Sequence, residues 1–324
     1  MGEMSATTEQ PIRGTTREAA LRAAAGGFLR RATALAAVCL TVGTLGACGS
    51  SETPATTIKI GTTDDKGEGW KAFAQEAKSH GIDLEVVSSW DYIGPNDELA
   101  SKQIDVNLAQ HLRSLARYNV AHNTQLVPVA STYIVPLGLY SKQHKTLAEI
   151  PQGGKVAIPD YPPDTARALL VLRDAGLVVL KGDPTSPTKD DVDPSSKVVV
   201  EAIKSDFLVR GYDEDDAAVI NNTWLPSAGV DPSAALAKDD PSALGDPDPQ
   251  KRARMEQYIN VIVVRPEDKD NPLYQRLADI YHSKPVQEAF ARQSKGSQID
   301  VKKTPAELQG VLAALENQIR ADQK

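Results

Sequence analysis

The chain has 324 residues, a formal net charge of −7 and a hydrophobic content of 41%. Its first 47 residues hold five of the 36 basic and three of the 43 acidic residues, so the remainder carries a net charge of −9. An acidic body of this size argues against a nucleic-acid partner, which needs a basic face, and it is long enough for two domains.

The N-terminal segment has the features of a secretory signal peptide. Five arginines precede an apolar stretch from Ala32 to Leu45, which leads through Gly46 and Ala47 to Cys48. This stretch is too short to span a bilayer, which takes about 20 residues. Leu-Gly-Ala-Cys resembles the lipobox of bacterial lipoproteins, in which the cysteine is lipidated after cleavage, here of residues 1–47. An ordinary signal peptide with a free Cys48 and a short signal anchor are the alternatives.

The two cysteines of the chain are both accounted for by this segment. Cys39 leaves with the signal peptide and Cys48 receives the lipid, so we expect no disulfide bond in the mature body. We expect a water-soluble body on the extracytoplasmic face of the cell membrane, anchored only through Cys48. Residues 48–57 are rich in Ser, Thr and Pro and are expected to form a flexible tether.

Beyond the tether, short apolar strands alternate with helices, which predicts parallel α/β units. The first half is expected to hold strands at 58–62, 84–87 and 104–108, helices at 70–80, 97–102 and 110–118, and one extended run over 126–140. The second half is expected to hold strands at 156–158, 217–220 and 258–264, helices at 165–175, 272–282, 285–293 and 305–320, and loops at 181–196 and 231–250. Residues 198–200 fit a strand or the start of a helix equally well.

Two of these segments are candidates for crossings between lobes, the run at 126–140 and the strand at 258–264. If both join the same two lobes, residues 58–136 and 258–324 form the first lobe and residues 137–257 form the second. The predicted fold class is therefore α/β with two lobes and two crossover strands. Ligand clefts favour such a junction.

The motif content favours a protein without catalytic activity. The five histidines lack a metal-ligand spacing such as HExxH, and the chain has no GxSxG motif. Its carboxylates are scattered over turns, where such residues mostly cap helices. We expect no catalytic residue, no metal and no cofactor. An enzyme acting on a small anion is a further hypothesis that no motif supports.

The strongest single candidate for a ligand contact is Arg167. It falls in the first turns of an apolar helix, where a cation faces the positive end of the helix dipole and requires an anion. A ligand carboxylate could supply that anion, bound by the guanidinium and by free backbone N–H groups. Asp164, three residues earlier, could equally supply it as a surface ion pair.

Other polar and aromatic residues follow predicted strands, where ligands of open α/β sheets bind. Tyr92 could stack on a ligand or cover the core, and His111 could donate to a ligand or cap a helix. Asn221 and Asn222 could anchor a ligand or close a turn. Trp224 could line the cleft or pack in the core. The residues alone leave each of these choices open.

Seven short segments of the body, spread over residues 58–291, share their order and spacing with a known family. They are Asp91–Asn96, Ile104–His111, Tyr140–Lys142, Val156–Pro159, Arg167–Leu170, Asp216–Asn221 and Tyr258–Val263. In these segments the chain resembles the NlpA-type lipoproteins, the methionine-binding components of ABC importers. The resemblance implies a type II periplasmic-binding-protein fold whose two lobes close over a small molecule and deliver it to a permease and its ATPase.

The resemblance also implies roles for individual residues. In that family, the arginine matching Arg167 binds the ligand carboxylate, and the positions matching Tyr92, His111, Asn221 and Asn260 lie at or near the pocket.

Three positions depart from the family pattern. Ala109 and Ser114 stand where the family has aromatic residues, and Asp160 stands where it has an asparagine. Each missing ring would bury about 150–250 Å², so a bulkier amino acid or a dipeptide could use the space.

The sequence thus predicts a monomeric substrate-binding lipoprotein for an amino acid or a short peptide-like zwitterion. Arg167 is expected to bind its carboxylate and Asp160, Asn221 and Asn260 its amine, while Tyr92 and Trp224 line the cleft. The alternative is a surface adhesin or sensor lipoprotein with the same fold and no transport role. A large exposed apolar patch beside the cleft would favour that alternative.

Overall fold

A computed structural model of the protein describes residues 56–63, 65–89 and 92–323, which belong to one compact unit. The predicted signal peptide, Cys48 and Asp91 lie outside the described residues. The tether was predicted two residues too long, because residues 56 and 57 already belong to the first strand.

The first sheet has five strands in the order β2-β1-β3-β11-β4. Its strands are β1 (Thr56–Thr62), β2 (Ile82–Ser88), β3 (Val106–Asn107), β4 (Val127–Ser131) and β11 (Val261–Val264). β1 pairs in parallel with β2 and β3, whereas β11 pairs antiparallel with β3 and β4. This sheet therefore combines strands from both ends of the described chain.

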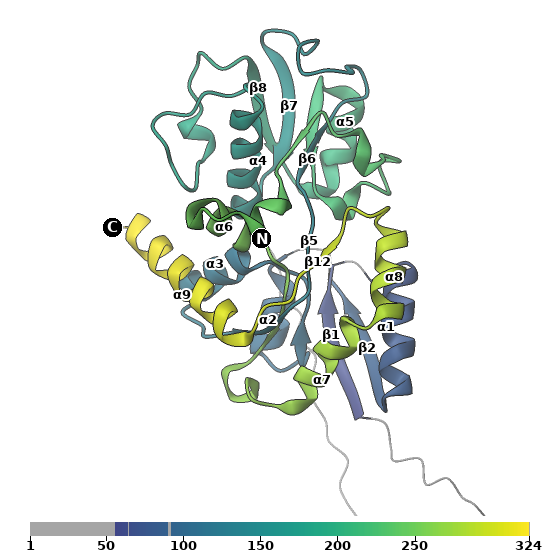
Figure 1. The fold of residues 1–324 in the computed structure, drawn as a ribbon. Helices are drawn as coiled ribbons and strands as arrows, with labels where there is room; N and C mark the ends of the chain where they lie inside the picture. The colour runs from purple at the N-terminus through teal and green to yellow at the C-terminus, as the bar shows by residue number, and fades with distance from the viewer. Residues whose placement is uncertain (1–55, 64, 90–91, 324) are drawn as a thin grey trace, which may run out of the picture. The chain divides into compact units, whose positions relative to one another are not determined.

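Six helices belong with the first sheet. They are α1 (Glu68–Ser79), α2 (Gly94–Ala100), α3 (Leu112–His122), α7 (Pro272–Tyr281), α8 (Lys284–Gln293) and α9 (Pro305–Asp322). α1 packs against α8, and α3 packs against α9, so helices from the two chain ends lie side by side (Figure 1). α9 begins at a capping box in which Thr304 and Glu307 exchange hydrogen bonds, as its sequence pattern favours.

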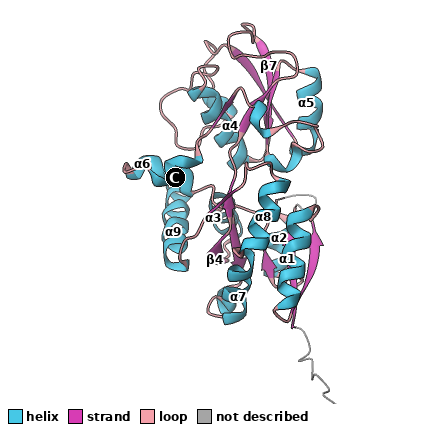
Figure 2. Ribbon diagram, turned by 45° about the vertical axis from the view of Figure 1, so that its right-hand side comes forward, coloured by secondary structure: helices cyan, strands magenta, loops and turns pink. Residues whose placement is uncertain are grey.

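The second sheet also has five strands, in the order β10-β6-β9-β7-β8. Its strands are β6 (Gly138–Tyr140), β7 (Gly154–Pro159), β8 (Val198–Ile203), β9 (Ala217–Ile220) and β10 (Ala237–Lys238), and its helices are α4 (Pro162–Asp174) and α5 (Leu208–Glu214). Figure 2 shows helices flanking the strands of both sheets. The ambiguous residues 198–200 form a strand. The sequence did not predict α5, whose glycine, Gly211, allows close packing on Ala157 of β7.

The chain crosses from the first sheet to the second along β4, β5 (Tyr133–Ile134) and β6, as the extended run predicted. β12 (Ile299–Asp300) pairs with β5, and Figure 1 shows both between the two sheets. The two-lobed α/β prediction is confirmed by this arrangement together with the solved structures compared below.

The second crossing was placed wrongly at residues 258–264, because β11 lies wholly in the first sheet. Leu244, and Met255 of α6 (Pro249–Glu256), already pack in the same core as Leu112. The return therefore occurs just after β10, where the backbone N–H groups of Leu137 and Asp239 donate to the Asp239 Oδ1 and the Leu137 carbonyl at 2.9 and 3.2 Å. These bonds join the two crossings.

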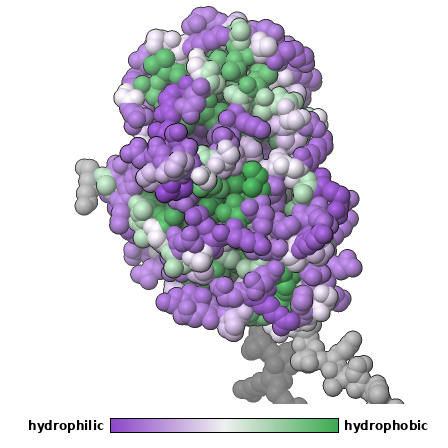
Figure 3. Space-filling model, viewed as in Figure 1, coloured by the Kyte–Doolittle hydropathy of each residue, from purple (hydrophilic) through white to green (hydrophobic). Residues whose placement is uncertain are grey.

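No helix among the described residues is long and apolar enough to cross a bilayer. No group of three or more His, Cys, Asp or Glu side chains in this part of the chain could hold a metal ion. On the face shown in Figure 3, polar residues dominate, with apolar residues at the level of the crossings. The large apolar side chains that are exposed come from separate segments: Ile93, Val179, Val199, Phe207 and Ile299.

Candidate ligand-binding site

A cavity of about 80 Å³ lies where loops from both sheets meet the crossings. Its wall includes the residues that follow β3, the first turns of α4, the residues that follow β9, and the crossing at residues 133–137. The predicted residues Tyr92, His111, Arg167, Asn221 and Asn260 all line it. The carboxyl ends of β3, β7 and β9 therefore meet at one place, as in other open α/β sheets.

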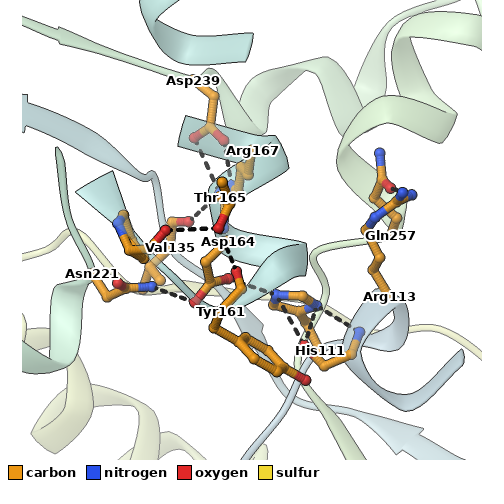
Figure 4. Close-up of polar contacts among 12 residues, drawn as sticks. His111, Arg113, Val135, Tyr161, Asp164, Thr165, Arg167, Asn221, Asp239 and Gln257 are labelled. Atoms are coloured by element: carbon orange, nitrogen blue, oxygen red, sulfur yellow. Dashed lines mark hydrogen bonds and ion pairs between the residues drawn. The ribbon is translucent and has the colours of Figure 1, made fainter. Parts of the chain in front are cut away.

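Arg167 is held in place by groups from both crossings. Its Nε and Nη2 donate to the two carboxylate oxygens of Asp239, and Nη2 also donates to the Val135 carbonyl at 2.8 Å. The guanidinium carbon lies 4.2 Å from the centre of the Tyr258 ring. The ion pair considered between Arg167 and Asp164 does not form, because Asp239 occupies the fork of the guanidinium (Figure 4).

One edge of this guanidinium remains available. Nη1 of Arg167 has no hydrogen-bond partner in the described part of the chain, and the side chain lines the cavity although it is only 6% exposed. A guanidinium whose other edge is fixed by a carboxylate, a carbonyl and a ring presents Nη1 in one orientation. Such preorganisation lowers the entropy lost when an anion binds.

Asp164 joins the two lobes inside the cavity wall. Its side chain is almost fully buried; Oδ2 accepts from Asn221 Nδ2 at 2.9 Å, and Oδ1 lies 3.4 Å from His111 Nε2 (Figure 4). Asp164 lies in the first turn of α4, where the helix dipole stabilises a negative charge. A negative charge is therefore fixed in the wall, close to the guanidinium of Arg167.

His111 caps α3, which is one of the two roles considered for it, and its side chain also lines the cavity. Its Nδ1 accepts from the Ser114 backbone N–H at 3.3 Å, which assigns the ring proton to Nε2 and makes Nε2 the donor to Asp164. Burial lowers the pKa of His111, and the hydrogen bond to Asp164 only partly opposes this effect. The imidazole is therefore neutral at neutral pH.

Asn221 carries an unsatisfied acceptor in the wall of the cavity. Its Oδ1 is buried and has no hydrogen-bond partner among the described residues, while Nδ2 donates to Asp164. The backbone carbonyl of Asn221 accepts from the Trp224 N–H at 2.9 Å in the turn that follows, but the side chain makes no capping bond there. A buried carbonyl left without a donor costs about 1–3 kcal/mol, which a donor on a ligand would recover.

Two tyrosines provide the aromatic part of the wall. The rings of Tyr92 and Tyr161 lie 5.5 Å apart with an interplanar angle of 33°. Burial raises the pKa of the Tyr92 hydroxyl, and the charge of Asp164 adds to this effect. The sequence did not indicate Tyr161, which adds a ring from the second lobe to the same cavity wall as Ala109 and Ser114.

Two predicted contacts lie outside the cavity wall. Asp160 is exposed, because its backbone N–H donates to the Ile203 carbonyl at the end of the β7–β8 ladder and its side chain is left at the surface. Trp224 packs beside the core formed by Leu208 and Ile220, and its buried indole N–H lies near the Tyr92 hydroxyl. Asp164 thus replaces Asp160 as the carboxylate of the site, and Tyr161 replaces Trp224 as the second ring.

Comparison with known proteins identifies the family. The sequence matches the NlpA lipoprotein family over residues 58–302, which is most of the chain. The chain belongs to the NlpA lipoprotein family. This membership confirms the predicted resemblance, and because the family consists of substrate-binding proteins, it also confirms that the chain is not an enzyme.

Individual relatives in the NlpA family are similar over nearly their whole length. D-methionine-binding lipoprotein MetQ from Escherichia coli (strain K12) is 32% identical over 259 residues, which cover 78% of this chain and 91% of the relative. The structure of protein PG110 from Staphylococcus aureus aligns with a TM-score of 0.70 and 30% identity, covering 80% of this chain and 99% of that one. A nutrient binding protein from Burkholderia cenocepacia bound to methionine aligns with a TM-score of 0.67 and 32% identity, over 75% and 99% of the two chains.

Proposed function

We propose that the protein captures one free amino acid with an apolar side chain, of the methionine type, in the cavity between its lobes and delivers it to the permease of an ABC importer. Lipidated Cys48 would anchor the protein to the extracytoplasmic face of the membrane. The lobes would comprise about residues 58–136 and 241–324 for the first and 137–240 for the second, with the return crossing moved to follow Asp239.

The observation that carries the proposal is that one cavity holds both an unpaired hydrogen-bond donor and an unpaired acceptor. The free Nη1 edge of Arg167 suits a carboxylate. The unpaired Oδ1 of Asn221 and the carboxylate of Asp164 suit an ammonium group. An α-amino acid carries both groups on adjacent atoms, and Asn260 lies in the same wall as a further polar contact.

The size and lining of the cavity favour a single amino acid. Its volume of about 80 Å³ is below the roughly 300–1,000 Å³ of pockets for drug-sized ligands. Tyr161 adds a ring to the wall of this small cavity, so we do not extend the proposal to dipeptides. Tyr92, Val135 and Leu137 offer apolar surface for the side chain. Two of the similar proteins are described as binding methionine, which agrees with this chemistry.

Closure of the lobes follows from the position of Arg167. Because its guanidinium contacts Val135 on one crossing and Asp239 on the other, a ligand on Nη1 is linked to both segments about which the lobes move. Ser297 of the first lobe donates to Asn222 Oδ1 of the second at 3.0 Å, and Lys295 pairs with Asp231 at 2.8 Å. These contacts between the lobes would form on closure and stabilise the bound state.

The adhesin or sensor alternative has less support, because two of the relatives named above are described as binding methionine. The large apolar side chains that are exposed come from different segments of the chain.

Calorimetric titration of the purified protein with the twenty amino acids and a set of methionyl dipeptides tests the proposal. We expect methionine or a similar apolar amino acid to bind and dipeptides to bind at least about tenfold more weakly. The Arg167→Gln variant is expected to lose at least about 30-fold in affinity, because removing one partner of a buried charge pair costs 2 kcal/mol or more. Arg173→Gln, on the same helix but paired with exposed Asp174 and Asp183, is the matched control. Equal affinity in Arg167→Gln and in the control would contradict the proposed carboxylate contact.

A further inference from the structure

A second site lies away from the amino-acid cavity, around Arg113 of α3. Two surface hollows of about 580 and 830 Å³ share Arg113, Asp183, Pro184 and Thr185 in their walls. The first-lobe side of these walls comes from α3, α6 and α9, and the second-lobe side from α4 and the loop at 183–188. Gln318 of α9 donates to the Thr185 hydroxyl across this junction.

Within the described residues, Arg113 is a buried cation without an ionic partner. Its side chain belongs to a residue only 4% exposed, and its one side-chain hydrogen bond runs from Nη1 to the neutral Oε1 of Gln257 at 2.7 Å. A guanidinium has five N–H donors, so four of them have no partner in the described part of the chain. Figure 4 shows Arg113 pointing to Gln257, away from the cluster of Arg167 and Asp164.

The surroundings of Arg113 make its buried charge less favourable still. Arg117 follows four residues later on α3, lines the smaller hollow and forms no ion pair within the described residues. Two like charges at i and i+4 repel each other, and Arg113 also lies in the first turn of α3, facing the positive end of its dipole. Burial lowers the pKa of Arg113, Arg117 lowers it further, and Asp322 of α9 attracts the charge without reaching ion-pair distance.

The carboxylates in the walls form no ion pair with these two cations. Asp183 is paired with Arg173 at 3.3 Å, and Glu256 and Glu307 are paired with Lys303 at 2.9 and 3.6 Å. Asp322 also lies in the wall of the smaller hollow and attracts Arg113 only from beyond ion-pair distance. A buried charge is normally paired, because its desolvation costs several kcal/mol. The unpaired nitrogens of Arg113 border open hollows, so an anion from solution can reach them.

From this cluster we infer that the junction of α3, α9 and the 183–188 loop binds a small dianionic oxyanion, such as inorganic phosphate or a dicarboxylate, with Arg113 as its buried contact and Arg117 as its outer contact. The bound anion bridges the two lobes, because the walls of the hollows come from both. This site does not depend on the proposed amino-acid ligand.

Thermal unfolding and calorimetry in chloride buffers of constant ionic strength, with added inorganic phosphate or succinate, test this site. We expect a saturable rise in the melting temperature of the wild-type protein with at least one of the two dianions. Arg113→Gln is expected to abolish the rise, and Arg117→Gln, an exposed position that leaves the fold intact, to weaken binding by about tenfold. Lys71→Gln, which removes an exposed cation from α1, is the control for net charge and is expected to behave as the wild type.

The Arg113→Met variant separates a ligand contact from a structural role. Without dianions, replacing an unpaired buried charge by an apolar side chain of similar length is expected to leave the melting temperature equal or higher. A large fall in the melting temperature of Arg113→Met would overturn the inference, because it would show that Arg113 stabilises the fold through Gln257. A dianion response that is absent, or equal in the wild type and in Arg113→Gln and Arg117→Gln, would overturn it as well.

Discussion

Replacing Asp239 by asparagine is expected to weaken the fold and strengthen ligand binding at the same time. Asp239 accepts two hydrogen bonds from the guanidinium of Arg167, and the two side chains are only 16% and 7% exposed. Removing one partner of a buried ion pair costs about 3–5 kcal/mol. Because Asn keeps one acceptor and the Val135 carbonyl remains, we expect a loss of about 3 kcal/mol in the free energy of unfolding.

The affinity should change in the opposite direction. In the wild-type protein, a ligand carboxylate on Nη1 would share one guanidinium with the Asp239 carboxylate on Nε and Nη2. Two like charges on the order of 7 Å apart repel by about 2 kcal/mol at an effective dielectric constant of about 20. Removing the charge of Asp239 is therefore expected to lower the dissociation constant of the amino acid by up to about 30-fold.

Chemical denaturation and calorimetry of the same samples measure both effects. Asp213→Asn is the matched control, since Asp213 pairs with Lys142 on the surface of the second lobe, with side chains 50% and 60% exposed. We expect this control to change neither quantity appreciably. If Asp239→Asn bound the amino acid more weakly than the control, the carboxylate would not lie on Arg167.

Three further predictions concern single positions. His111→Asn keeps a capping side chain but removes the titrating group. Because burial lowers the pKa of His111, the unfolded chain takes up a proton below pH 6.5 that the folded chain does not, so the stability of the wild-type protein should fall with decreasing pH by up to about 1.4 kcal/mol per pH unit. Denaturation of the variant should lack this part of the pH dependence. Asn221→Ala should raise the dissociation constant of the amino acid by about 10- to 100-fold in calorimetry, because the ligand ammonium loses a charged hydrogen bond; an unchanged constant would show that Oδ1 faces no ligand. Gly69→Ala should destabilise the protein by about 1–3 kcal/mol in thermal unfolding, since a Cβ would collide with the Phe290 ring where α1 meets α8. Gly310→Ala, which has open space around it on α9, should stabilise the protein by about 0.5–1 kcal/mol. Equal effects of the two substitutions would refute the close packing at Gly69.

The sequence predicted elements well where periodicity and caps agree. α7, α8 and α9 begin and end within two residues of the expected ranges, because each has a proline in its first turn and an apolar stripe. The return crossing was missed because residues 231–250 are rich in Pro and Asp, which indicates loop equally on a surface and at a lobe junction. Only tertiary packing, such as that of Leu244 on the core of the first lobe, distinguishes the two.

Local sequence patterns also fail to reveal the tertiary contacts of single residues in the cavity. The position of Arg167 in a cavity was predictable, but its partner Asp239 lies 72 residues later and no local pattern connects them. Asp160 was chosen because it stands where the family has an asparagine, and Asp164 was considered only as an ion-pair partner of Arg167, because the helix was expected to begin at residue 165. Pro162 is the first residue of that helix, a place that proline favours. Read from Pro162, the sequence places Asp164 in the first turn and leaves Asp160 outside the helix.

A crystal structure of the purified protein grown with methionine would test the central claim most directly. The account predicts one amino acid between the lobes, with its carboxylate within hydrogen-bond distance of Arg167 Nη1 and its ammonium facing Asn221 Oδ1 and Asp164. A ligand bound elsewhere, or one in this cavity with its carboxylate turned away from Arg167, would contradict it.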